Sequence, residues 1–368
     1  MRILRVVVGV YPSEVTGIGL HAHELSRHQA KLGHEVMVYT SNSVNGQQES
    51  YTNYNVKNFN NVLKIFGNPI SISLFSELIR NRNSFDIIHA HSHLFFSTNI
   101  CAFIKKMGSS PLVITNHGLI SQTAPLCVSK VYIPTIAKWT FKCADKIICY
   151  TEEDKLALEH LNIDSDKLVV IHNGVNTDLF LPAQKKEKTG QLLWIGRFTP
   201  GKGVDYLIEA FKILLSTHPN LKLLMVGKGP LKDQAYQQIK NFHLEKNIII
   251  KDFIPNCELP EAYRQSDVFI LPSVNEGVPR TILEAMSCET PVVCTKLPQL
   301  VDIVTGCGLM VPLKDSEAIA KAVFNIISDE QLAKNLGENG RKRVVNNFSW
   351  SDTVSKTIEL YGELLCQK

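Results

Sequence analysis

The chain has 368 residues, of which 44% are hydrophobic, and a formal net charge of +4. This length predicts two domains of ordinary size, each with its own apolar core. The charge is mild, and the densest basic run, residues 185–188, is short and interrupted by an acid, so we expect no nucleic-acid partner.

The nine cysteines are odd in number and scattered, without a Cys-x-x-Cys pair, which indicates neither a zinc site nor a disulfide framework. The apolar run at residues 1–10 is too short for a signal peptide, and no stretch approaches the ~20 apolar residues that span a bilayer. We therefore expect a cytoplasmic protein, either dissolved or held peripherally on the inner face of the membrane.

Short apolar runs alternate with helical patterns along the chain, which predicts an α/β protein with largely parallel sheets. The predicted strands are residues 3–10, 35–40, 86–90, 111–115, 146–150, 168–171, 192–195, 221–226, 248–251, 268–271, 291–294 and 308–311. The pattern lapses around residues 176–190, so we expect two doubly wound, Rossmann-like domains, 1–178 and 179–351, that face each other across a cleft. The Asn-rich segment 42–61 is expected to be an irregular insertion.

The first strand leads to Gly17-Ile-Gly19-Leu-His-Ala22, which matches the G-x-G-x-x-A dinucleotide fingerprint. The glycines follow the strand by six residues rather than at once, and no acid near residues 39–40 could hold a ribose, so a nicotinamide-type site is disfavoured. Gly17 could instead bring the backbone close to a phosphate at the helix start, or serve only as a packing turn.

Three histidines, His89, His91 and His93, alternate at the end of the third predicted strand. On a strand end they would point the same way, and His-x-His is also a metal-ligand spacing. No acid follows within twenty residues, so we expect no metal. A wall of His91 and His93 that contacts an acceptor, and a purely structural role, both stay open.

Two segments of the second half carry charges beside predicted strand ends. Arg197 and Lys202 follow the strand 192–195, and a guanidinium fork together with a mobile ammonium suits a diphosphate. The segment 273–286 reads as a Gly loop and a helix start near Pro279, which makes an anion site bracketed by Glu276 and Glu284. At ~1.5 Å per residue, Glu284 lies ~7 Å beyond that site, which suits a hydroxylated group attached to the phosphate.

The segment Glu276-Gly-Val-Pro-Arg-Thr-Ile-Leu-Glu284-Ala-Met resembles the Glu-x7-Glu signature of retaining glycosyltransferases of family 4 (group 1, GT-B fold). The resemblance covers nearly the whole chain. It implies that Gly17, Arg197, Lys202, Gly277 and Val278 bind the donor diphosphate. It also implies that His117 and Glu276 act at the donor sugar, that Glu284 holds the ribose, and that the base lies near Gly227, Phe253 and Ile254. It further implies that the last helix, residues 352–368, packs back on the first domain.

The sequence departs from that family at several positions beside the site. Thr16 stands in place of the first of two glycines, and Pro255 and Glu289 each stand where a glycine is usual. Gln299 and Leu300 replace a common Pro-Glu pair. Because these positions flank the donor, we leave the identity of the base open.

The resemblance implies transfer of a hexosyl unit from a UDP- or GDP-linked sugar to a glycan, a lipid-linked acceptor or a small molecule. It implies no cofactor and no metal, since fixed cations would replace the metal. The alternative is a non-catalytic sugar-nucleotide-binding protein or complex subunit. The segment 128–141, with Lys130, Lys138 and Trp139 among apolar residues, predicts either contact with an anionic membrane or a core-facing helix.

Overall fold

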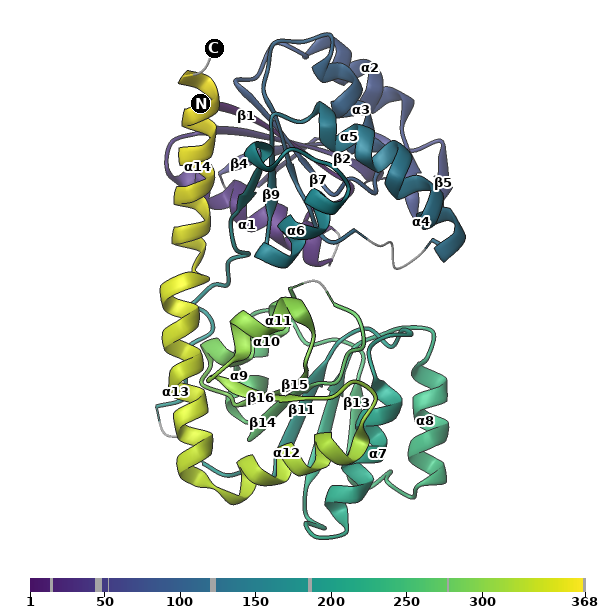
Figure 1. The fold of residues 1–368 in the computed structure, drawn as a ribbon, viewed down its shortest axis with the longest axis vertical. Helices are drawn as coiled ribbons and strands as arrows, with labels where there is room; N and C mark the ends of the chain where they lie inside the picture. The colour runs from purple at the N-terminus through teal and green to yellow at the C-terminus, as the bar shows by residue number, and fades with distance from the viewer. Residues whose placement is uncertain are drawn as a thin grey trace. The chain divides into compact units, whose positions relative to one another are not determined.

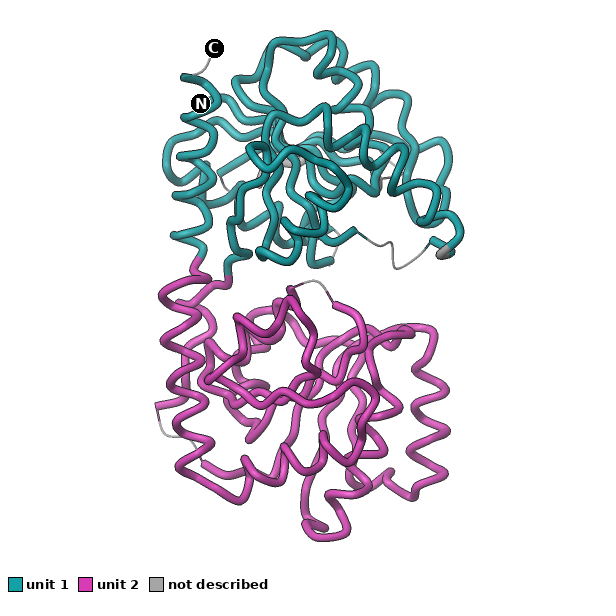
Figure 2. The backbone as a smooth tube through the Cα atoms, in the orientation of Figure 1, with its two compact units in different colours: residues 1–174, 350–368 teal, residues 175–349 magenta. Residues whose placement is uncertain are grey.

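The computed structural model describes residues 1–13, 16–43, 48–51, 53–119, 124–184, 187–276 and 278–366 (Figure 1). The chain divides into two compact units (Figure 2). Unit 1 consists of Met1–Gly174 and Trp350–Lys368, and unit 2 of Val175–Ser349. The sequence placed the boundary after residue 178 and the return of the chain at residue 352.

Unit 1 is built on an eight-stranded sheet of order β10-β9-β8-β7-β1-β2-β4-β3, parallel except for β3. Its strands are β1 Arg2–Val7, β2 Glu35–Ser43, β3 Gln48–Tyr51, β4 Tyr54–Asn60, β7 Ile87–His91, β8 Leu112–Thr115, β9 Lys146–Cys149 and β10 Leu168–Val170. A separate hairpin is formed by β5 Leu63–Ile65 and β6 Asn68–Ile70. The helices are α1 Gly17–Lys31, α2 Ile72–Arg80, α3 Phe96–Lys105, α4 Leu126–Tyr132, a π-helical turn Ile133–Ala137, α5 Lys138–Cys143, α6 Glu152–His160, a 3₁₀ turn Ser165–Lys167 and α14 Trp350–Cys366.

The prediction of an irregular insertion at residues 42–61 is wrong for most of that segment. Strand β4 pairs in parallel with β2 and antiparallel with β3. Tyr54, Val56 and Phe59 are buried, but the asparagines between them hide the alternation that marks a strand. Residues 44–47 and 52 lie outside the described part of the chain.

Unit 2 is built on a six-stranded parallel sheet of order β13-β12-β11-β14-β15-β16. Its strands are β11 Gln191–Ile195, β12 Lys222–Val226, β13 Ile248–Lys251, β14 Val268–Leu271, β15 Val292–Thr295 and β16 Gly308–Val311. Its helices are α7 Val204–Leu215, α8 Lys232–Asn241, α9 Leu259–Arg264, α10 Arg280–Ser287, α11 Pro298–Val304, α12 Ser316–Ser328 and α13 Glu330–Asn347.

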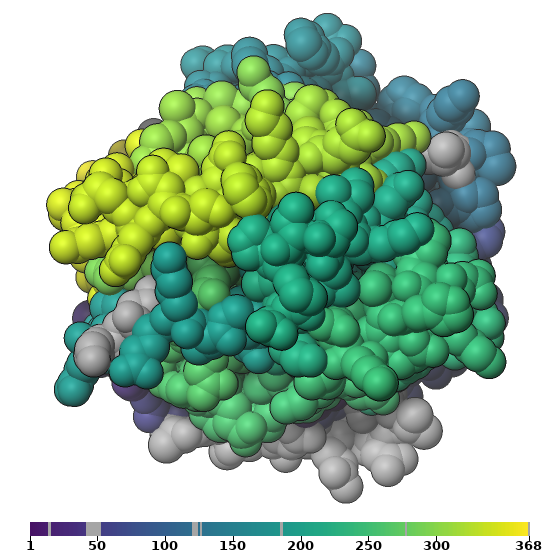
Figure 3. All heavy atoms as spheres, turned by 90° about the horizontal axis from the view of Figure 1, so that it is seen from below, coloured from purple at the N-terminus to yellow at the C-terminus, as the bar shows by residue number. Residues whose placement is uncertain are grey.

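Apolar side chains cover both faces of the unit 2 sheet. Leu192 and Trp194 of β11 pack with α7, α8 and α12, whereas Leu193 between them packs with α10 and α11. Figure 3 shows the side of this unit on which α7 and α12 lie next to each other. Burial on both sides explains why these strands read as short continuous apolar runs.

In both sheets the strand order reverses beside the first strand of the unit, which is the topological switch point of the sheet. In unit 2 the chain proceeds outward from β11 through β12 and β13, and then returns to the other side of β11 with β14. In unit 1 the corresponding neighbours are β1 and β7. Loops after these strands diverge and leave room for a ligand at the carboxyl edge of the sheet.

The last helix, α14, belongs to unit 1. Leu360, Tyr361 and Leu364 pack in one cluster with Ile3 and Val7 of β1. Just before it, Phe348 packs in the core of unit 2, and its carbonyl accepts from Val175 N–H at 2.8 Å. The chain therefore leaves and re-enters unit 1 at neighbouring points.

Candidate functional site

The loops that follow β11 and β14 meet at the switch point of unit 2. Lys202 Nζ lies 2.5 Å from Glu276 Oε1, and the two side chains are only 14% and 6% exposed. Arg197, two residues after the end of β11 and on the same loop as Lys202, is exposed. The Lys202–Glu276 pair therefore lies at the edge where a doubly wound sheet binds ligands, and Arg197 belongs to the same loop as Lys202.

Glycines allow these loops to approach one another. Gly203, at φ +64°, would place a Cβ 2.0 Å from the Pro272 carbonyl oxygen at the end of β14. Gly227, after β12, has φ +150°, and a Cβ there would lie 1.8 Å from the Gly196 carbonyl oxygen. Any side chain at either position would push apart the loops that carry Arg197, Lys202 and Glu276.

Glu276 is held by groups beyond Lys202. Ser273 Oγ donates to Glu276 Oε1 at 2.7 Å, and the Gln299 side-chain amide donates to the Glu276 main-chain carbonyl. Gln299 is one of the departures from the family pattern, and the structure gives it a role in holding this loop. Glu289, another departure, has φ +57°, a conformation that favours the glycine usual at that position.

Glu284 lies in α10 and is buried at 4% exposure. Its Oε2 accepts from Tyr263 Oη at 2.9 Å, and its Oε1 is 3.8 Å from Arg280 Nε. Burial raises the pKa of Glu284, while Arg280 and the Tyr263 hydroxyl act in the opposite direction. Within the described part of the chain, Nε and Nη1 of Arg280 have no hydrogen-bond partner, so this guanidinium has donors available for an anionic or carbonyl group.

The other predicted residues of unit 2 surround this centre. Phe253 is 54% exposed after β13, whereas the neighbouring Ile254 is partly buried against the core cluster. Val278 is also partly buried and packs on that cluster. Gly277 lies outside the described residues. A cavity of about 340 Å³ lies beside the same loop and is lined by Gly201, Gly203, Val274 and residues of α7 and α8.

In unit 1, Gly17 is the first residue of α1. Thr16, which stands where the family has a glycine, is the N-cap, and its Oγ1 accepts from Gly19 N–H at 3.0 Å. A Cβ on Gly17 would meet no described atom within 4 Å. The first turn of α1 is therefore capped by Thr16, and the space next to the Gly17 Cα contains no described atom.

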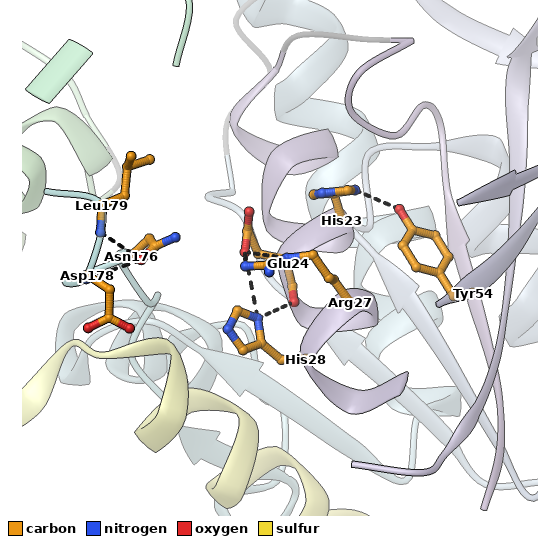
Figure 4. A network of polar contacts seen from close by, with 8 residues as sticks. All are labelled: His23, Glu24, Arg27, His28, Tyr54, Asn176, Asp178 and Leu179. Atoms are coloured by element: carbon orange, nitrogen blue, oxygen red, sulfur yellow. Dashed lines mark hydrogen bonds and ion pairs between the residues drawn. The ribbon is translucent and has the colours of Figure 1, made fainter. Parts of the chain in front are cut away.

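Figure 4 shows polar contacts made by side chains of helix α1. His23 Nδ1 lies 2.7 Å from the Tyr54 hydroxyl of β4. Glu24 binds Arg27 at 2.6 Å and lies 3.6 Å from His28. The contact of His23 ties the helix that carries Gly17 to the sheet, whereas the contacts of Glu24 lie within the helix itself.

His117 follows β8 and belongs to a cluster of aromatic and imidazole rings. Its Nε2 lies 3.1 Å from His91 Nδ1, and its Nδ1 lies 3.1 Å from the Tyr150 hydroxyl. The ring of His21, from α1, is 5.4 Å away. Burial and the neighbouring His21 and His93 hold the pKa of His117 well below its usual range, so the ring is neutral.

The prediction that His89, His91 and His93 point the same way is wrong for His93. Strand β7 ends at His91, Ser92 has φ +65°, and His93 packs against the Phe141 ring at 4.7 Å. His91 and His93 are both fully buried, so they form no wall against which an acceptor could lie. The contacts of the three histidines therefore support a structural role for this motif.

A metal at the same motif is disfavoured by its chemistry. The Arg5 guanidinium lies 3.1 Å from His89 Nδ1 and from His91 Nε2, where it takes the lone pairs that a metal would need. Across the described residues, no group of three or more His, Cys, Asp or Glu side chains is arranged to hold a metal ion. Sequence reasoning missed Arg5, because a single arginine within an apolar strand shows no pattern.

Two family models divide the chain within a few residues of the boundary between the two units. The model described as Glycosyltransferase Family 4 matches residues 15–179, and that described as Glycosyl transferases group 1 matches residues 177–343. The chain belongs to the family 4 glycosyltransferases of group 1. Its two Rossmann-like units are those of the GT-B fold.

Relatives and solved structures cover nearly all of this glycosyltransferase. It is 28% identical to an uncharacterised glycosyltransferase of Methanocaldococcus jannaschii, over 99% of both chains. It is also 28% identical to the UDP-Gal:alpha-D-GlcNAc-diphosphoundecaprenol alpha-1,3-galactosyltransferase of Escherichia coli, over 81% of this chain and 80% of the relative. A sucrose-phosphate synthase from Thermosynechococcus elongatus has a similar structure, with a TM-score of 0.83 and 21% identity over 100% of both chains. Anabaena HepE in complex with UDP matches with a TM-score of 0.80 and 18% identity, over 99% of this chain and 100% of HepE.

The segment 128–141 of the glycosyltransferase has both buried and exposed apolar side chains. Ala137 and Phe141 are buried in the unit 1 core, whereas Val131 and Ile136 are 66% and 48% exposed. Lys106 Nζ lies 5.4 Å from the centre of the exposed Trp139 ring. None of the described helices is both long enough and apolar enough to cross a bilayer.

Proposed function

We propose that the chain is a retaining glycosyltransferase that moves a hexosyl unit from a nucleoside-diphosphate sugar, UDP-linked in preference to GDP-linked, to a glycan, glycolipid or small-molecule acceptor. The observation that carries this proposal is the pairing of Lys202 with Glu276 at the switch point of unit 2, on loops that also carry Arg197. The Escherichia coli relative is named for a UDP-galactose donor, and Anabaena HepE was solved with UDP, which supports a uridine nucleotide.

The charges suit the chemistry of the departing nucleotide. As the bond between sugar and phosphate breaks, negative charge grows on the diphosphate, and Arg197 and Lys202 stabilise that charge. The diphosphate competes with Glu276 for Lys202, and the carboxylate released in this way can accept hydrogen bonds from the sugar hydroxyls. Two fixed cations supply the role that a divalent metal fills elsewhere, so we propose transfer without a metal.

A donor-turnover assay tests this function. The full chain is incubated with UDP-glucose, UDP-galactose, UDP-N-acetylglucosamine and GDP-mannose, with and without EDTA, and with a polyprenyl-diphosphate sugar or an oligosaccharide as acceptor. Release of one nucleoside diphosphate that depends on acceptor and resists EDTA supports the proposal. An α-linked product from an α-linked donor, read by proton NMR, supports retention. Binding of a donor without turnover under any condition would instead identify a non-catalytic sugar-nucleotide-binding subunit.

We further propose that unit 1 contacts an anionic membrane through the outer side of residues 126–143, which would bring a lipid-linked acceptor to the enzyme. Val131, Ile136 and Trp139 supply exposed apolar area. Lys130 and Lys138 lie among them and supply charge. Apolar insertion combined with attraction to anionic lipid is the usual basis of peripheral binding.

A further inference from the structure

Arg5, in the middle of β1, is completely buried. Its donors meet neutral acceptors, which are Ser26 Oγ at 2.8 Å, Gln29 Oε1 at 2.5 Å, and His89 Nδ1 and His91 Nε2 at 3.1 Å each. The Tyr361 hydroxyl is a further neutral neighbour, and it lies 2.5 Å from His89 Nδ1, to which it can donate. No carboxylate forms an ion pair with it in the described part of the chain. Burial of a guanidinium without a counter-charge is costly, so the contacts it makes need an explanation.

The contacts of Arg5 determine where two histidines carry their protons. A guanidinium can only donate, so His89 Nδ1 and His91 Nε2 must both be unprotonated acceptors. The proton of His89 is then on Nε2, which lies 2.7 Å from Thr115 Oγ1. The proton of His91 is on Nδ1, which lies 3.1 Å from His117 Nε2. Burial and the charge of Arg5 also lower the pKa values of His89 and His91 well below their usual range, which keeps both rings neutral.

The same argument passes from His91 to His117. Because His91 Nδ1–H donates to it, His117 Nε2 must be an acceptor, and the proton of a neutral His117 is on Nδ1. The Tyr150 hydroxyl lies 3.1 Å from this Nδ1 and 3.4 Å from Nε2. We infer that Arg5 is a positioning residue that fixes His117 as its Nδ1–H tautomer through His91.

This arrangement limits what His117 can do. Its Nε2 accepts from His91, and the Tyr150 hydroxyl lies beside both ring nitrogens, so neither nitrogen is open to exchange a proton with a ligand. Its main-chain polar groups are what it can offer to a donor sugar. The inference deepens the proposed function and rests on it only in this last step, since the tautomer itself requires no ligand.

Nitrogen-15 NMR of the full chain with labelled histidines tests the inference without substrate. The His117 resonances are assigned by their loss in His117→Asn. We expect a protonated Nδ1 and an unprotonated Nε2 at pH 7, with no titration through the ordinary histidine pKa of about 6.5. In Arg5→Met, His91 loses the donor on its Nε2, so His117 should show a mixture of both tautomers. Ser26→Ala, which removes only an acceptor of Arg5 Nε, should leave the wild-type pattern.

A second pair of variants serves if Arg5→Met does not fold. In His91→Gln the amide oxygen can accept from Arg5 and the amide N–H can donate to His117, whereas His91→Leu can do neither. We expect the Nδ1–H tautomer of His117 to persist in the first and to be lost in the second. A protonated Nε2 in the wild type, or identical His117 spectra in wild type, Arg5→Met and His91→Leu, would overturn the inference. An enzyme with the expected tautomer but no glycosyl transfer would contradict the proposed function alone.

Discussion

Lys202 and Glu276 stand 74 positions apart in the chain, yet Nζ of one lies 2.5 Å from Oε1 of the other. Both are largely shielded from water, where an ion pair is stronger than at the surface. The pair joins the loop after β11 to the loop after β14. A diphosphate that takes Lys202 would therefore also free Glu276, which would couple donor binding to the carboxylate that we propose lies at the sugar.

Replacing Glu276 by Gln should separate catalysis from binding. We expect donor turnover to fall by about 100-fold or more, as for loss of one preorganised charge or hydrogen-bond group in other enzymes. The affinity for UDP should be retained or should rise slightly, because Lys202 no longer has a competing carboxylate. Turnover assays and calorimetry with UDP measure the two effects.

The matched control is Glu245→Gln, because Glu245 is an exposed acid elsewhere in unit 2. It should change neither quantity. Wild-type turnover in Glu276→Gln would refute the assignment of Glu276 to the site.

Gly227→Ala should destabilise unit 2 and weaken nucleotide binding together. The native φ of +150° is strained for alanine, and the new Cβ would lie 1.8 Å from the Gly196 carbonyl oxygen, so a loss of about 2 kcal/mol or more in unfolding free energy is expected. Gly362→Ala is the control, since its Cβ would meet no described atom within 4 Å in α14 and alanine favours a helix by up to about 1 kcal/mol. Equal free energies of unfolding for the two variants in urea, or equal melting temperatures in thermal unfolding, would contradict this account of the loop.

Stability should decline as the pH falls below about 6.5. Burial lowers the pKa of His93 to about 4, so between these values the unfolded chain binds a proton that the folded chain excludes. At about 1.4 kcal/mol per pKa unit, this one group can remove up to about 3 kcal/mol by pH 4. Denaturant unfolding should show that the free energy of unfolding falls less between pH 7.5 and pH 5 in His93→Leu than in the wild type. His160→Leu, at an exposed position, should decline like the wild type; an unchanged slope in His93→Leu would argue against the role of His93.

Much of the fold was predictable from sequence, because strands buried on both faces are short apolar runs. The predicted strands 248–251, 268–271 and 308–311 have the same bounds in the structure. The predictions that were wrong have local causes. Asparagines hid the pattern of β4, and the αL conformation of Ser92 turned His93 away from His91.

The sequence predicted residues for the candidate site but not the contacts between them. Lys202 and Glu276 were both identified, with separate roles, because the sequence cannot show which side chains pair across distant loops. Arg5 and Tyr150 were missed altogether, since each stands alone in an apolar run. Their importance comes from neighbours that only the sheet order brings together, through β1, β7, β8 and β9.

Membrane contact should depend on the outer side of residues 126–143. The wild type should sediment with anionic liposomes at low salt, and Val131→Asp should reduce the bound fraction several-fold, because a charge replaces exposed apolar area. Phe324→Asp, at an apolar position of unit 2 that is 41% exposed, is the control and should bind normally. Failure of the wild type to sediment at low salt would remove the membrane proposal and leave the transferase proposal intact.

The most direct test of the central claim is thermal stabilisation by nucleotides without added metal. UDP, GDP, ADP, CMP and NAD are compared on the wild type, on Lys202→Met and on the control Lys240→Met, which alters an exposed lysine of α8. A ligand at about 100 times its dissociation constant stabilises by about 2.7 kcal/mol. We predict a shift with UDP that is retained in Lys240→Met and largely lost in Lys202→Met. A shift with NAD alone, or a UDP shift equal in all three proteins, would contradict a donor site built on Lys202 and Glu276.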